Sequence, residues 1–96
     1  MPAVHRFGDQ NIAGGAVNTI PQTSVFANEK LISVVGSRGT ADSSCSHNNI
    51  HCSGNWATTG GTSTVFVEGI PINLPGDIDT CGHPRSAVAS PDVFAE

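Results

Sequence analysis

The chain has few basic residues and few of the residues that build helices. Of its 96 residues only 4 are Lys or Arg, against 8 Asp or Glu, and the formal net charge is -4. A protein that neutralises phosphates needs more cations than this, so we expect no nucleic-acid partner. Leu, Met, Lys and Arg are scarce, whereas Val, Ile and Thr are frequent, and there are 11 Gly and 6 Pro. This composition predicts an all-β fold of short strands and turns.

Long apolar stretches are also missing. No run reaches the length of a membrane span, and the first residues lack the apolar core of a secretory signal, so we expect a chain made in a cytoplasm. Residues 1-96 are predicted to form one domain, whose small core needs a staple. The 3 cysteines are an odd number, which argues against a full disulfide framework and favours metal binding in a reducing compartment.

An internal repeat organises the sequence. The dipeptide Val-Phe occurs three times, at Val25-Phe26, Val65-Phe66 and Val93-Phe94. A glycine follows the first two copies after the same interval, at Gly36 and Gly76, whereas the third copy ends the chain and the matching Gly8 lies near its start. The two chain ends together make one unit, so three equal units exist only if the termini meet in space.

Each unit is predicted to be a β-hairpin. Residues 24-27 turn at Asn28-Glu29 and return along 31-35, and residues 64-67 turn at Glu68-Gly69 and return along 71-74. Two strands joined by two residues form the commonest hairpin. The third hairpin would pair residues 93-96 with residues 1-7.

Equivalent positions of the returning strands alternate in polarity. One position is apolar in all three: Val4, Ile32 and Ile72. The next is polar: His5, Ser33 and Asn73. Neighbouring positions face opposite sides of a strand, so we expect one buried and one open face, with His5 exposed and not a metal ligand. The three units also share one aromatic position, occupied by Phe26, Phe66 and Phe94. These side chains would either pack together or form three equal wedges.

The middle unit carries an inserted loop at about residues 37-62. The interval from glycine to the next Val-Phe is 17 residues in the other two units and 29 here. The insertion holds four of the chain's seven Cys and His residues: Cys45, His47, His51 and Cys52. Loops longer than their counterparts are usually functional or disordered. Trp56, on the same loop, is predicted to be a local anchor.

Two loops carry the potential metal donors. Cys81 and His83 lie on the third unit's loop, which starts at a glycine equivalent to that of the inserted loop and should emerge on the same side. Their donors could converge on one tetrahedral zinc or iron ion. A disulfide between Cys45 and Cys52 is the alternative, but metal is favoured for a chain made in a cytoplasm. The aspartates at 9, 77 and 79 are interpreted as turn formers, and without a visible nucleophile we expect no enzyme.

The motifs of the three units resemble those of the PAAR-repeat family over the whole chain. The matches are Pro2-Ala3-Val4 to Gly8-Asp9, Pro71-Ile72-Asn73-Leu74 to Gly76-Asp77, and Ser90-Pro91-Asp92-Val93-Phe94-Ala95, with Ser37 where Asp is usual. Three matches in the correct phase make the resemblance specific. The length and the ends are most similar to the phage baseplate branch of the family.

This resemblance implies a small cone of three pseudo-threefold hairpin repeats with a metal-stapled tip. It implies the structural tip of a membrane-puncturing spike, in a phage tail or a type VI secretion system. The partner would be a trimeric β-helical spike, capped at its blunt end by one copy per trimer, a monomer on the spike. The protein would be made in the host cytoplasm, reside in the virion at the tip of the baseplate's central spike, and contact the target cell envelope transiently.

The resemblance also implies a ligand set. The family commonly uses three His and one Cys near the vertex, which gives His47, His51, Cys81 and His83 around one zinc ion, with iron possible. Cys45 or Cys52 could replace the fourth ligand, and Ala13 leaves the first unit without one. The alternative function is a small zinc-binding adaptor domain unrelated to a tail.

Overall fold

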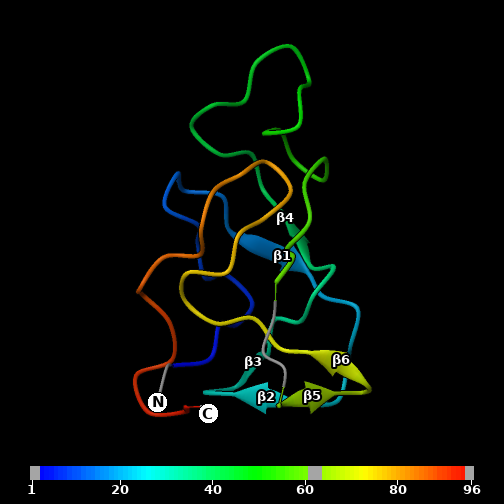
Figure 1. Ribbon diagram of the computed structural model, residues 1–96, viewed down its shortest axis with the longest axis vertical. Helices are drawn as coiled ribbons and strands as arrows, with labels where there is room; N and C mark the ends of the chain where they lie inside the picture. The colour runs from blue at the N-terminus through cyan, green and yellow to red at the C-terminus, as the bar shows by residue number, and fades with distance from the viewer. Residues whose placement is uncertain (1–2, 61–63, 95–96) are drawn as a thin grey trace.

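The computed structural model describes residues 3-60 and 64-94, and in these residues all regular structure is β. The chain forms a tapering body 37 Å long and 24 by 22 Å across (Figure 1). The strands are β1 Val17–Thr19, β2 Phe26–Ala27, β3 Lys30–Leu31, β4 Arg38–Gly39, β5 Phe66–Val67 and β6 Ile70–Pro71. None of the described residues forms a helix that could cross a membrane.

The two complete hairpins are confirmed. β2 pairs with β3 and β5 pairs with β6, both antiparallel, at the wide end of the body (Figure 1). Their two-residue turns have positive φ at both positions, 54° and 65° at Asn28 and Glu29, and 52° and 79° at Glu68 and Gly69. This is the turn geometry whose twist matches that of the flanking strands.

The third hairpin is confirmed as well. Ala3 pairs with Phe94 in an antiparallel bridge, and the Val4 N–H donates to the Val93 carbonyl at 3.0 Å. Two segments from opposite ends of the chain therefore lie side by side. The turn predicted at Met1 and Glu96 lies outside the described residues.

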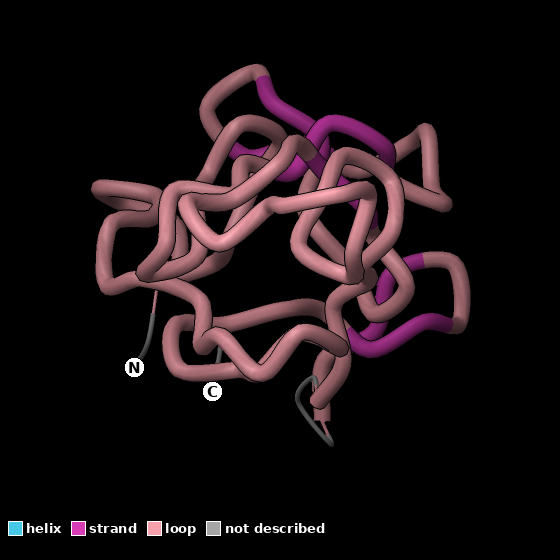
Figure 2. The backbone as a smooth tube through the Cα atoms, turned by 90° about the horizontal axis from the view of Figure 1, so that it is seen from above, coloured by secondary structure: helices cyan, strands magenta, loops and turns pink. Residues whose placement is uncertain are grey.

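The three returning strands close into a ring of backbone hydrogen bonds, and the view from above shows the chain winding around the middle of the body (Figure 2). The Ser33 N–H donates to the His5 carbonyl at 2.9 Å, Asn73 donates to Ser33 at 2.9 Å, and His5 donates to Asn73 at 3.2 Å. A second cyclic set lies further along the chain, where each unit's strand pairs with the next unit: Val17 with Gly39, Thr58 with Asp79, and Arg85 with Asn11. The fold thus has pseudo-threefold symmetry.

One backbone hydrogen bond of the ring cannot form, because a proline occupies the donor position. The Phe7 N–H donates to the Leu31 carbonyl at 2.8 Å, and the equivalent Val35 N–H donates to the Pro71 carbonyl at 2.9 Å. The third equivalent residue is Pro75, which has no N–H to donate. The seam between the last and first units therefore has one bond fewer.

Both faces of the ring are buried, which corrects the prediction of an open polar face. The apolar position forms the core with residues of the hairpins: Val4, Ala27, Ile32, Val34, Val67, Ile72 and Leu74. The polar position is equally inaccessible, with His5, Ser33 and Asn73 all at 0% exposure. The return loops cover this face, because His5 Nε2 lies 2.8 Å from the Ser86 carbonyl oxygen. Burial lowers the pKa of His5.

Equivalent tight turns lead from the ring to the loops. Gly8, Gly36 and Gly76 have φ of 88°, 93° and 90°. The residue after each glycine accepts, through its side chain, a bond from the backbone N–H that opens the turn: Asp9 from Arg6, Ser37 from Val34, and Asp77 from Leu74. Ser37 thus reproduces the contact made by aspartate in the other two units.

Trp56 anchors the inserted loop, as predicted. Its side chain is fully buried, and Nε1 donates to the Thr40 carbonyl at 2.9 Å. The indole lies against Gly39, where an added Cβ would lie 2.7 Å from Trp56 Cζ2 and would overlap the Ala16 carbonyl oxygen. The loop therefore depends on a glycine at this position.

We expect Gly39→Ala to destabilise the protein by about 2 kcal/mol or more, because the new methyl group meets backbone and a buried ring with no room to move. Urea unfolding monitored by tryptophan fluorescence measures this. Ser43→Ala, an exposed change in the same loop, is the control. Equal midpoints for Gly39→Ala and the parent would contradict the tight packing.

Candidate metal centre

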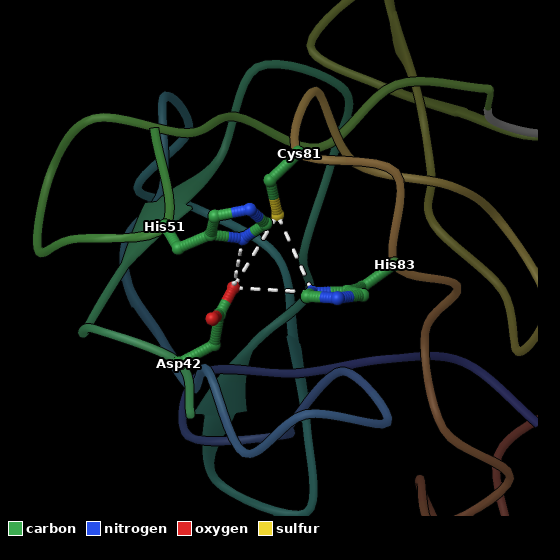
Figure 3. Close-up of side chains that lie close together, drawn as sticks. All are labelled: Asp42, His51, Cys81 and His83. Carbon is green, nitrogen blue, oxygen red and sulfur yellow. Dashed lines mark hydrogen bonds and ion pairs between the residues drawn. The ribbon is translucent and has the colours of Figure 1, made fainter. Parts of the chain in front are cut away.

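Four side chains capable of binding metal meet near the narrow end of the body. Asp42, His51, Cys81 and His83 each place one ligand atom within 4.8 Å of those of the others. Two come from the inserted loop and two from the loop of the third unit, and all four point toward one another (Figure 3). The predicted convergence of these two loops is therefore present.

The third-unit loop presents its two donors from a tight turn. The Gly82 N–H donates to the Asp79 carbonyl at 2.9 Å, and Gly82 has φ of 91°. Asp79 Oδ1 accepts from both the Cys81 thiol and the His83 N–H, each at 3.0 Å. Asp79 therefore positions both donors.

The inserted loop presents the other two donors, Asp42 and His51, from the place where its two ends come together. The Asp42 N–H donates to the His51 carbonyl at 2.9 Å, which brings the two ends of the segment together. Asp42 Oδ1 accepts from the Ser44 N–H at 2.8 Å, so that Oδ2 is left facing the cluster. The Ser43 N–H donates to the Ala13 carbonyl at 2.9 Å, and this hydrogen bond connects the base of the inserted loop to the first unit.

The distances between donors fit a tetrahedral site. Asp42 Oδ2 lies 3.1 Å from Nδ1 of both histidines, and Cys81 Sγ lies 3.5 Å from Asp42 Oδ2 and 3.6 Å from His83 Nδ1. Usual zinc bond lengths give tetrahedron edges of about 3.3 Å for N–O, about 3.5 Å for S–O and about 3.6 Å for S–N. These four of the six donor distances therefore suit one ion, and the other two donor pairs lie within 4.8 Å.

The electrostatics of the cluster also suit a cation. Burial alone would raise the pKa of Asp42, but hydrogen bonds from the Ser44 N–H, His51 and Cys81 hold that pKa below its usual value. Burial, together with the hydrogen bond to Asp79, raises the pKa of the Cys81 thiol to about 12. A bound ion would displace the thiol proton, and the aspartate and the resulting thiolate would then carry two negative charges that balance a divalent ion.

Asp79 also links the cluster to a buried arginine. Its Oδ2 accepts from Asn11 Nδ2 at 2.9 Å and lies 3.6 Å from Arg85 Nη1, with both side chains of this ion pair fully buried. The Arg85 guanidinium lies 5.6 Å from the ring centroid of Trp56. Asp79 is therefore more than the turn former that the sequence indicated, because it supports the thiol of Cys81 from within the core.

The structure brings together three of the predicted ligands: His51, Cys81 and His83. His47 lies outside the cluster, on an exposed part of the loop with φ of 52°. The preference for metal over a disulfide at Cys45 and Cys52 was wrong, since the two are bonded to each other. They can pair because the segment between them folds back, with the Cys52 N–H donating to the Asn49 carbonyl.

Asp42 is the potential metal donor that the sequence reasoning missed. Only Cys and His were considered as ligands, so Asp42 was left out, although it lies only three residues before Cys45. An aspartate carboxylate is an ordinary zinc ligand and occurs together with Cys and His ligands. It is buried, at 6% exposure, which also marks it as more than a solvated loop residue.

We expect Asp42→Asn to weaken zinc binding by about tenfold to a hundredfold while leaving the fold intact, since the amide keeps the shape but not the charge. Competition with a chromophoric chelator measures the affinity. Glu29→Gln, an exposed carboxylate in a hairpin turn, is the matched control. An unchanged zinc affinity in Asp42→Asn would remove Asp42 from the site.

The chain matches no protein-family model, and no curated protein is significantly similar to it in sequence. The function is therefore argued from the residues and the geometry.

Proposed function

We propose that this protein is the metal-stapled tip of a membrane-puncturing spike, and that it caps a trimeric β-helical spike in a phage tail or a type VI secretion system. The observation that carries the proposal is a ring of three equivalent hairpins with equally exposed aromatic side chains. This ring lies at the wide end of the body, and the inserted loop with its metal donors lies toward the narrow end (Figure 1).

The three aromatic side chains support docking on a threefold partner. Phe26, Phe66 and Phe94 are 56%, 53% and 49% exposed. Of the two arrangements expected from the sequence, the exposed wedges fit and the packed cluster does not. Exposed aromatics related by symmetry are typical of an interface, and a pseudo-threefold monomer can offer each chain of a trimer nearly the same contact.

A metal ion would have a structural role in this tip. The apolar core lies among the hairpins and ring strands, whereas the two upper loops are joined mainly by polar contacts. Zinc, or iron, held by Asp42, His51, Cys81 and His83 would fasten the inserted loop to the third unit. Four protein donors fill a tetrahedral site, which supports a structural ion over a hydrolytic one and a protein that is not an enzyme.

The resemblance to PAAR repeats supports the same assignment. Its motifs coincide with the hairpins and the glycine turns, with Ser37 making the aspartate's contact in the middle unit. On this basis we propose that the protein belongs to the baseplate branch of that family and lies at the virion's central spike tip, after synthesis in the host cytoplasm. It would contact the target cell envelope only during puncture.

The proposal is tested by stoichiometry. Mixed with a purified trimeric β-helical spike encoded beside its gene, the protein should form a complex with one copy per three spike chains, measured by mass in solution. Because hairpin edges and apolar side chains make the contact, the complex should survive raised salt. A one-to-one chain ratio, or no complex at any salt, would favour the zinc-binding adaptor instead.

A further inference from the structure

The disulfide lies directly beside two of the four metal donors. Cys52 follows His51 in the chain, and Cys45 lies three residues after Asp42. Cys45 and Cys52 are bonded to each other, so this bond closes residues 45-52, a loop that contains His51 and begins three residues after Asp42. The proposed metal ligands and the disulfide therefore belong to one small structural unit.

The remaining contacts within this unit are hydrogen bonds between backbone groups and polar side chains. The Asp42 N–H donates to the His51 carbonyl, and the His51 N–H donates to Asn49 Oδ1 at 3.0 Å. Asn49 Nδ2 in turn reaches the Ser44 carbonyl at 3.2 Å. Most of the segment is exposed, and two of its residues, His47 and Asn48, have positive φ. Because these contacts are polar and largely exposed, a covalent closure should restrict the conformational freedom of the loop further.

We infer that Cys45 and Cys52 form an oxidative modification site that sets how tightly the tip holds its metal. This inference rests on the metal site of the proposed function. With the disulfide formed, Asp42 and His51 are held at the separation that a metal requires. With the two thiols reduced, the segment gains conformational freedom, and the ion must order it before it can bind.

The oxidant would be a small disulfide such as oxidised glutathione, or a disulfide oxidoreductase. A thiolate of the pair attacks the oxidant's disulfide and releases one reduced thiol. The second protein thiolate then attacks the mixed disulfide and releases the other, so two protein thiols lose two protons and two electrons as one S–S bond forms. Cys45 is exposed and Cys52 is buried, so Cys45 should supply the thiolate that attacks the oxidant, and Cys52 the one that then attacks the mixed disulfide.

The coupling is reciprocal. If the disulfide raises zinc affinity tenfold, then bound zinc must favour the disulfide tenfold over the dithiol. For a two-electron couple this is a shift of about 30 mV toward a more negative reduction potential. A tip made in a reducing compartment would thus hold its ion loosely, and would tighten on it once exposed to an oxidising one.

Zinc titrations of the full chain test this inference. Zinc affinity is measured by competition with a chromophoric chelator, before and after reduction with a phosphine that does not bind metal. Reduction should weaken zinc binding by about tenfold, and the double variant Cys45→Ser/Cys52→Ser should bind as weakly under both conditions. The matched control, Ser46→Ala/Ser53→Ala, changes exposed neighbours of both cysteines and should behave like the parent.

Two outcomes would overturn the inference. Equal zinc affinity in the oxidised parent and the double variant would mean that the disulfide does not organise the site. Tighter binding after reduction would mean that the thiols themselves bind metal and compete with the disulfide. Docking on the spike is measured on the same samples, since a failure to dock with the redox effect intact would count against the proposed function and leave the coupling in place.

Discussion

Cys81→Ser is expected to lose bound zinc and to melt at least about 10 °C below the parent. Cys81 supplies the one thiolate of the cluster, and its sulfur lies 3.5 Å from Asp42 Oδ2 and 3.6 Å from His83 Nδ1. The binding free energy of a structural ion adds to the free energy of unfolding, and each kcal/mol shifts the melting temperature of a domain this small by about 4–8 °C. Elemental analysis and calorimetry of protein purified without chelator measure both effects.

The matched control is His47→Ala. His47 lies on the inserted loop but outside the cluster, and it is exposed. It should keep close to one ion per chain and the parent's melting temperature. If Cys81→Ser retains its zinc, or melts at the temperature of the zinc-loaded parent, Cys81 is not a ligand. Loss of zinc from His47→Ala would restore the ligand set expected from the sequence.

Removing the three exposed aromatic side chains should abolish docking. The triple variant Phe26→Ser/Phe66→Ser/Phe94→Ser is expected to bind the trimeric spike at least a hundredfold more weakly than the parent, since central aromatic residues dominate interface free energies. Each single variant should weaken binding by a similar factor of about tenfold, because the three positions are equivalent. Affinity for the purified spike is measured by biolayer interferometry.

The fold should survive these changes, because about half of each phenylalanine is already exposed. Zinc content reports on folding independently of docking. Ile50→Ser is the control, as Ile50 is 44% exposed on the inserted loop, far along the chain from the hairpins. Unequal losses among the three single variants would argue against a threefold contact, and full affinity in the triple variant would exclude this surface.

Much of the fold was predictable because the spacing within the repeat determines which residues pair across each hairpin. The spacing of Val-Phe and glycine placed the two-residue turns, and the circular phase placed Ala3 opposite Phe94. Even the bond missing from the ring can be recognised in the sequence at Pro75, once the equivalent positions are known. Local turn chemistry and strict spacing were sufficient for these features.

The burial of His5 was not predictable from alternation. An alternating strand usually has one solvated face, but here three strands close into a ring and the return loops cover the second face. The partner of His5 Nε2 is the carbonyl of Ser86, which lies 81 residues further along the chain. Only the closed topology shows that the polar face is internal.

The metal cluster was predictable as a meeting of two loops but not as a set of atoms. Which of six Cys and His residues would converge depended on the path of the inserted loop, and no spacing rule describes a loop without regular structure. The disulfide used the two alternative candidates, and Asp42 stands in the cluster in place of the predicted His47. The expectation that a chain made in a cytoplasm uses its cysteines for metal was wrong for Cys45 and Cys52. These two residues lie on one segment that folds back and brings their sulfur atoms together.

A pseudo-threefold base that carries a single inserted loop has a consequence for how the assembled tip would look. On a threefold spike the three rotations of the cap are equivalent by symmetry, and the three hairpins give every spike chain nearly the same contact. The inserted loop would then point in a different direction from one particle to the next. Images averaged with threefold symmetry would preserve the hairpins and blur the loop that holds Asp42 and His51.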